Sequence, residues 1–114
     1  MNLSEASPEL LDRVAERFAA LSDPTRLRLL LALREAELGV SELAEVVGIS
    51  QPTASKHLAA LRRAGLVQGD RVGTKTVCRV DDASVFDLCG IVCEGVVRHQ
   101  AARHAALLGD GDGI

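Results

Sequence analysis

Residues 41–58 have the sequence SELAEVVGISQPTASKHL. Ser41 and Ser50 belong to the residue types whose side chains accept a backbone N–H group at the start of a helix. Gly48 is the residue type that most often follows the end of a helix, and Pro52 is tolerated in a first helical turn. The stretch therefore predicts two short helices that meet at a tight turn, with Ser41 and Ser50 as their N-caps.

The second of these helices has two different faces. Ala54, Leu58 and Leu61 recur at helical spacing and form the expected inward row. The opposite side carries short polar groups and cations, which can reach base edges or phosphates. Such a pair of helices is a helix-turn-helix, whose second helix enters the major groove of DNA. The predicted DNA contacts, two of them in the following hairpin, are Ser50, Gln51, Thr53, Ser55, Lys56, His57, Arg63, Arg71 and Lys75. For His57, packing and a phosphate contact are both open.

Two further helices are expected before this motif. Ser7-Pro8 is a good helix start, and apolar residues then recur at helical spacing to about residue 21. Asp23-Pro24 repeats the signal and predicts a helix that ends between residues 34 and 37. Its expected buried side is marked by Leu27, Leu30 and Leu31.

A hairpin and a long helix are expected after the motif. Residues 66–68 and 75–80 favour strands, joined by a turn at Gly69–Thr74. A last helix should run from residue 82 or 83 to about 108. The predicted fold class is mainly α with a small β-hairpin: a winged helix-turn-helix of five helices with a two-stranded wing. One domain is expected at 1–110, followed by a frayed tail at 111–114.

Composition fits one small domain that gains from a partner subunit. The chain has 114 residues, of which 47% are hydrophobic and 25% charged. Phe18 and Phe86 are its only aromatic residues, so the core must be built from Leu, Val and Ala. Dimerisation is therefore plausible before any motif is considered.

Charge is distributed unevenly along the chain. The net charge is -3, yet residues 51–79 hold six basic residues and one acidic residue, a net charge of +5. The remaining residues carry -8. A basic segment in an acidic chain is a candidate phosphate-binding surface, because lysine and arginine displace counterions from a polyanion. The alternative is a solvated charged face.

The expected cellular compartment is inferred from the missing patterns of a signal peptide and of a membrane-spanning segment. The N-terminal residues have no basic segment followed by an apolar one, and no run of 18 apolar residues occurs. A cytoplasmic protein is expected. The three cysteines, an odd number in a reducing compartment, are expected to be free thiols.

Several stretches in order resemble one family. They are LSDPTRLRLL at 21–30, SELAEVVGISQPTASKHL at 41–58, LRRAGLV at 61–67 and GDRVGTK at 69–75. Over roughly residues 10–105 the chain resembles the ArsR/SmtB family. This resemblance implies homodimeric repressors that pack through their first and last helices and release operator DNA when an effector binds.

Two metal sites that the resemblance suggests are altered in this chain. Members that sense soft metals often have Cys-Val-Cys where this sequence has Gly39, Val40 and Ser41. Neither glycine nor serine is a soft-metal ligand, so that site is absent. A second family site uses carboxylates and histidines on the last helix. Asp82 fits that pattern, but the other ligand positions fall on Ser84, Gly95 and Arg98, with His99 one residue beyond.

Cys89 and Cys93 remain as candidate effector ligands. Their i, i+4 spacing places both sulfur atoms on one face of a helix, which suits a shared thiophilic ion better than an intrahelical disulfide. A third ligand would come from a partner chain or from Cys78, His99 or His104. The alternative is that the pair only packs, since cysteine behaves as a small hydrophobe. Cys78, on an apolar strand, is expected to be core.

The predicted function is therefore a sequence-specific DNA-binding transcriptional repressor. Its release from operator DNA would follow binding of a thiophilic metal or metalloid, or oxidation; the cofactor is otherwise unknown. The alternative is a winged-helix DNA-binding protein that is constitutive or regulated by a partner protein. An enzyme is not expected, because nothing supplies the base, orienting partner and anion-stabilising loop that nucleophilic catalysis needs.

Overall fold

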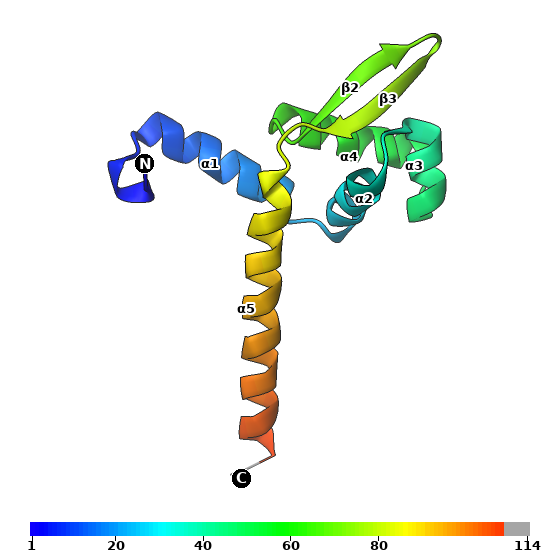
Figure 1. The fold of residues 1–114 in the computed structure, drawn as a ribbon. Coiled ribbons are helices and arrows are strands. Elements are labelled where there is room, and N and C mark those ends of the chain that lie inside the picture. Colours follow the sequence, from blue (N-terminus) through cyan, green and yellow to red (C-terminus); the bar gives the residue numbers. More distant parts are fainter. Residues whose placement is uncertain (109–114) are drawn as a thin grey trace. The chain divides into compact units, whose positions relative to one another are not determined.

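A computed structural model describes residues 1–108 of the chain (Figure 1). It contains a short 3-10 helix, five α-helices and three strands within that range. The elements are η1 (Leu3–Glu5), α1 (Pro8–Ala20), α2 (Pro24–Glu35), β1 (Leu38–Gly39), α3 (Val40–Val47), α4 (Gln51–Arg63), β2 (Val67–Val72), β3 (Lys75–Val80) and α5 (Ser84–Leu107). They form two compact units, residues 1–82 and a second unit that begins at Ala83 and contains α5. The predicted frayed tail at 111–114 lies outside the described residues.

Three helices have side-chain N-caps, and each cap is the residue that the sequence predicts. Ser7 accepts a hydrogen bond from the backbone N–H of Leu10 at the start of α1, and Asp23 accepts from Arg26 at the start of α2. Ser50 accepts from the next turn of α4 in the same way. Gly48 ends α3 with φ of 79°, a conformation that favours glycine. These predicted helix boundaries are confirmed.

The prediction that Ser41 caps α3 is wrong. The N-cap is Gly39, and Ser41 is already inside the first turn. The reason is β1, which pairs with β3 and places Leu38 opposite Cys78 and Gly39 opposite Val77. The chain therefore passes from strand to helix without a loop. The carboxylate of Glu42 caps this start by accepting the N–H of Gly39 at 2.9 Å.

The sheet is larger and its turn tighter than expected. β2 and β3 are antiparallel, with Val72 opposite Lys75, so only Gly73 and Thr74 lie between the strands. The predicted turn at Gly69–Thr74 is therefore wrong at its start, since residues 69–72 belong to β2. Gly73 has φ of 64°, which allows this short connection. β1 adds a third strand, giving the order β1-β3-β2.

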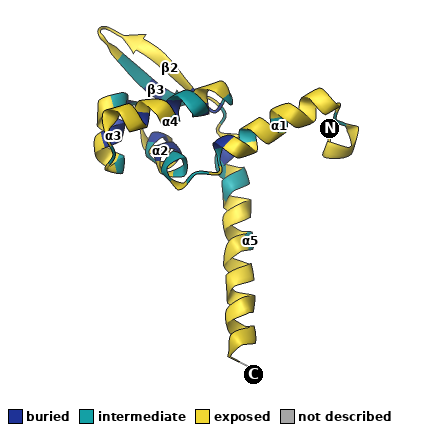
Figure 2. Ribbon diagram, turned by 180° about the vertical axis from the view of Figure 1, so that it is seen from behind, coloured by how far each residue is buried: buried dark blue, intermediate teal, exposed yellow. Residues whose placement is uncertain are grey.

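The core of residues 1–82 lies where α2, α3 and α4 meet the sheet (Figure 2). α4 buries its predicted row, and both Leu66 and Cys78 are fully buried. The buried side of α2 differs from the prediction. Leu31 is 56% exposed, whereas Leu29 and Leu33 are buried together with Leu30. The buried leucines of α2 also follow helical spacing, but they are rotated from the predicted row.

α1 and α5 expose many of their apolar side chains. α5 runs for 24 residues, and Val85 is its one buried residue within the described part of the chain. Figure 2 shows most of this helix in the colour of exposed residues. On α1, Phe18 is 52% exposed. Within residues 1–108, no helix has the length and apolar character needed to cross a membrane.

Candidate nucleic-acid interface

The candidate site is built on α4, which packs against α2 and α3. Its buried residues are Ala54, Leu58 and Leu61, each no more than 1% exposed. The predicted candidates on its other side are exposed, as the helical wheel predicts: Gln51, Thr53, Ser55, Lys56 and Arg63. One helix thus joins the core through aliphatic side chains and presents polar and cationic groups to solvent.

Ser50 and Thr53 form a local hydrogen-bonded pair at the start of α4. Ser50 Oγ accepts the N–H of Thr53 at 3.2 Å, and its hydroxyl donates to Thr53 Oγ1 at 2.8 Å. Ser50 therefore caps the helix and orients the neighbouring hydroxyl. The hydroxyl proton of Thr53 stays available to an acceptor outside the protein.

His57 is half-buried and is held by a residue that the sequence did not indicate. Arg26 of α2 donates its Nε–H to His57 Nδ1 at 3.1 Å. In the neutral ring Nδ1 is then the acceptor and the proton lies on Nε2, so Nε2 can donate a hydrogen bond. Packing and outward donation are thus compatible roles for His57. Arg26 lies 31 residues away in sequence, and no local pattern signals the contact.

The wing, formed by β2 and β3, contains one cation that is paired within the described part of the protein and two that are not. Arg79 donates to Asp70 at 2.7 Å and to Gln68 at 2.8 Å. The hydrogen bond and charge of Asp70 raise the pKa of the Arg79 guanidinium. By contrast, Arg71 and Lys75 are exposed, and neither forms a salt bridge within residues 1–108. The charge that the wing can offer to an external anion therefore comes from these two residues.

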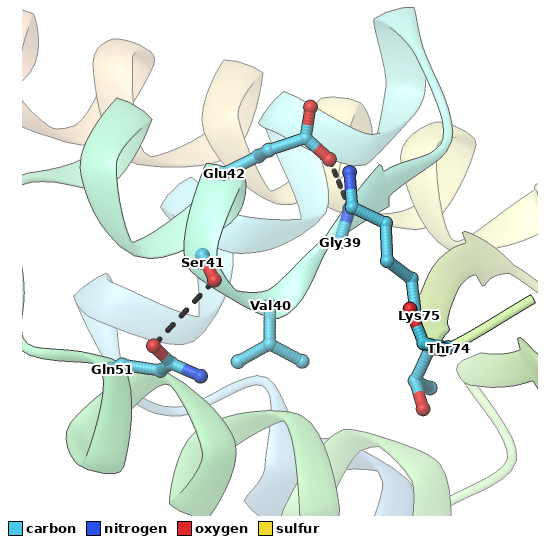
Figure 3. A pocket seen from close by; sticks show the side chains of 8 residues that line it. Gly39, Val40, Ser41, Glu42, Gln51, Thr74 and Lys75 are labelled. Atoms are coloured by element: carbon cyan, nitrogen blue, oxygen red, sulfur yellow. Dashed lines mark hydrogen bonds between the residues drawn. The ribbon is translucent and has the colours of Figure 1, made fainter.

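A hollow of about 300 Å³ lies between the start of α3, the start of α4 and the turn of the wing. Figure 3 shows Ser41, Gln51 and Lys75 around it. Ser41 Oγ and Gln51 Oε1 are 3.5 Å apart, at the outer limit of a hydrogen bond. Lys75 and Gln51, which are 24 positions apart, thus line the same hollow. Hydroxyl, amide and ammonium donors here can hold an anionic oxygen.

The cysteines occupy three different environments. Cys78 is fully buried in β3, as predicted, and burial raises the pKa of its thiol. Cys89 is half-buried; burial raises its pKa first, and the neighbouring charge of Cys93 adds to this. Cys93 is exposed. No cluster of three or more His, Cys, Asp or Glu side chains suited to a metal ion occurs within residues 1–108.

Asp82, the acidic residue that fits the family pattern of a metal ligand, is engaged in an ion pair. Its Oδ2 lies 2.6 Å from Nη1 of Arg17. Arg17 also donates its Nε–H to the carbonyl oxygen of Ala64 at 3.2 Å. This arginine therefore ties α1 to the end of α4 and to the end of the hairpin.

Comparisons with known proteins agree with this geometry. The family model described as bacterial regulatory protein, arsR family, matches residues 23–68. A probable mercury resistance operon repressor from Streptomyces lividans is 44% identical over 85% of this chain and 74% of its own length. The transcriptional repressor SmtB of Mycobacterium tuberculosis is 39% identical over 65% of this chain, which spans only 55% of that protein.

Solved structures agree as well. The homodimeric winged helix-turn-helix DNA-binding domain of a possible ArsR-family regulator from Mycobacterium bovis has a TM-score of 0.74 and 33% identity, over 85% of this chain and 95% of that one. The repressor BigR from Xylella fastidiosa has a TM-score of 0.64 and 34% identity, over 74% of this chain and 86% of that one. The chain therefore belongs to the arsR family of bacterial regulatory proteins and has their winged helix-turn-helix fold.

Proposed function

We propose that this protein is a sequence-specific DNA-binding transcriptional repressor that acts as a homodimer in the cytoplasm. The observation that carries the proposal is the division of α4 into a buried aliphatic row and an exposed row of polar and cationic side chains. A helix anchored in this way can enter a major groove without disturbing the core. Its family is one of transcriptional regulators and not of enzymes.

The exposed residues divide into two groups by their chemistry. Gln51, Thr53 and Ser55 are short hydrogen-bonding side chains near the start of α4, and we assign base contacts to them. The remaining candidates position the protein on phosphates: Lys56, Arg63, Arg71 and Lys75 as cations, and His57 as an uncharged donor. Ser50 acts indirectly, because its own hydroxyl proton is bonded to Thr53 Oγ1. The hollow between α4 and the wing supports this assignment, because Lys75 and Gln51 line it together.

The homodimer is proposed from the apolar side chains that α1 and α5 leave exposed. Phe18 is 52% exposed on α1, and Ile91 and Val97 are 68% and 67% exposed on α5. Burying such side chains against a second copy is favourable at about 25 cal/mol per Å². A two-fold dimer would separate its two α4 helices by about 34 Å, one turn of DNA. Such a dimer would bind a palindromic operator.

Cys89 and Cys93 are the proposed effector site, for a thiophilic metal or metalloid or for an oxidant. Their i, i+4 positions on α5 support a shared ion. A relative named as a probable mercury resistance operon repressor supports the metal class. Because Cys78 is fully buried, a third ligand would come from His99, His104 or the partner chain. The second candidate is a constitutive or partner-regulated winged-helix DNA-binding protein without a small-molecule effector, which the partial burial of Cys89 favours.

Selection of duplexes from a random DNA library tests the DNA-binding function directly. The purified protein should enrich one palindromic motif, and fluorescence anisotropy should then show at least about 1,000-fold tighter binding to that motif than to scrambled DNA. Equal affinity for every duplex would refute sequence-specific binding.

The effector proposal is tested on the selected duplex. Zinc, nickel, cadmium, arsenite and peroxide are titrated in parallel against wild-type protein and the C89S/C93S double variant. We expect at least one of the five to release wild-type protein and to leave the double variant bound. A double variant that responds fully would refute the site, and five inert effectors would favour the second candidate.

A further inference from the structure

A cavity of about 370 Å³ lies between α1, α2 and α4 and shares no lining residue with the hollow beside the wing. Its lining residues are Glu16, Ala19, Ala20, Arg26, Ala60 and Arg63. Its volume lies within the range of small-molecule sites, roughly 300–1,000 Å³. We propose that this cavity binds a small organic carboxylate with one negative charge and a compact apolar body.

The charge of the lining favours a monoanion. Arg26 and Arg63 oppose Glu16, which leaves a net charge of +1. Neither Arg26 nor Arg63 forms a salt bridge with Glu16 within residues 1–108. Arginine matches a carboxylate through paired N–H donors, and such charge-assisted contacts are about twice as strong as neutral ones.

Arg26 is already oriented. Its Nε–H donates to His57 Nδ1 at 3.1 Å, and its side chain makes no other hydrogen bond within the described residues. Both Nη groups therefore remain available to a ligand. A guanidinium that is held before binding loses less conformational entropy when the ligand arrives.

Small side chains provide room for the apolar body of the ligand. Ala19 and Ala20 contribute methyl groups from α1, and Ala60 contributes one from α4. Arg17 fixes the distance between these helices by donating to the carbonyl oxygen of Ala64 at 3.2 Å. The helices that frame the cavity are therefore connected without a ligand.

This placement gives the ligand a route to the DNA-binding surface. Arg63 belongs both to the cavity and to the proposed phosphate contacts, so a carboxylate bound here would compete with a phosphate for its charge. This regulatory consequence rests on the proposed DNA-binding function, whereas binding of the carboxylate does not.

Benzoate is the probe, and binding is followed by calorimetry and by amide chemical shifts of labelled protein without DNA. We expect one benzoate per chain, with the largest shift changes at Ala19, Ala20 and Ala60. Benzyl alcohol, which lacks the charge, and inorganic phosphate, which lacks the apolar body, should each bind at least tenfold more weakly. Phosphate binding equal to that of benzoate would show a general anion patch and overturn the proposal.

Two matched pairs of variants locate the site. Arg63→Gln should weaken benzoate binding at least tenfold, and Arg62→Gln, next to it and outside the cavity, should leave binding unchanged. Ala60→Leu fills the cavity and should abolish binding, whereas the half-buried Ala59, which does not line it, should tolerate leucine. Circular dichroism confirms that each variant is folded. Equal effects within either pair would refute the location.

A final titration adds benzoate to the complex with the selected duplex. Release of DNA by wild-type protein, but not by Ala60→Leu, would support the competition at Arg63. Benzoate binding by a protein that binds no DNA would refute the proposed function alone. Specific DNA binding by a protein that binds no benzoate would refute this inference alone.

Discussion

α4 and α5 both carry apolar rows at helical spacing, but only α4 buries its row within the described chain. Ala54, Leu58 and Leu61 are at most 1% exposed, whereas Val92 and Val96 of α5 are both 53% exposed. The surface that α4 leaves to solvent is polar and cationic, and that of α5 includes several large apolar side chains. A polyanion suits the first surface and a second protein chain suits the second. Under the proposed function, α4 therefore binds DNA and α5 contributes to the dimer interface.

The largest expected effect tests whether the apolar row of α4, unlike that of α5, is packed within a single chain. Leu58→Ala should lower the free energy of unfolding by about 2–5 kcal/mol, because it leaves a cavity in a closed core. This loss should be the same at all protein concentrations. The matched variant Val97→Ala, on the exposed side of α5, should have a cost that depends on protein concentration. Urea unfolding at several concentrations measures both, and a concentration-independent cost for Val97→Ala would contradict the contrast.

A charge on the apolar side of α5 should act on DNA binding from a distance. Val96→Glu would place an unpaired carboxylate, and its two-fold mate, in the proposed dimer interface. We expect monomers in light scattering and a loss of DNA affinity of at least about 100-fold, because the second half-site then binds separately. Arg98→Gln, which changes the net charge by the same amount on the opposite side of α5, is the control. Tight DNA binding by a Val96→Glu monomer would exclude this role for α5.

The wing offers a smaller and more selective test on the polar side. Arg71→Ala or Lys56→Ala should reduce the salt dependence of DNA affinity by about one unit of slope, with similar losses on specific and scrambled duplexes. The double variant D70N/R79Q removes the internal ion pair of the wing without changing net charge. Its salt slope should match that of wild-type protein. A larger change of the salt slope in the double variant than in Arg71→Ala would show that Arg79, and not Arg71, offers its charge to DNA.

The smallest effect concerns Cys78. Burial raises its pKa above the ordinary value of 9.0, so the unfolded chain loses this proton at a lower pH than the folded chain does. The contribution of the protonated Cys78 thiol to the free energy of unfolding is therefore fully present below pH 9.0. It is lost as pH rises above that value. Urea midpoints between pH 7.5 and 10.5 should fall more steeply for wild-type protein than for Cys78→Ala. Equal slopes for the two proteins would contradict the raised pKa of Cys78.

Local signals were sufficient for most helices and for the faces of α4. Ser7, Asp23 and Ser50 cap as predicted because an N-cap acts on the backbone within three residues. Gly48 ends α3 for a similarly local reason. The exposed residues of α4 follow from its helical period, although their DNA contacts remain proposals. These features needed no knowledge of the tertiary structure.

The wrong prediction for Ser41 and the missed role of Arg26 both result from contacts between residues that are far apart in the sequence. The sequence predicts Ser41 as the cap of α3, but pairing of Leu38 with Cys78, 40 positions away, places the N-cap at Gly39. The bond between Arg26 and His57 likewise joins α2 to α4. A two-residue strand and a single cross-helix hydrogen bond leave no periodic signal in the sequence. Both were therefore visible only in the structure.

The most direct test of the central claim is a map of amide chemical shifts when the selected duplex is added to labelled protein. The account predicts that the largest changes fall on the exposed residues of α4, including Gln51, Ser55 and Lys56, and on the turn of the wing. Changes confined to α5, with α4 unaffected, would contradict the claim that α4 binds the duplex.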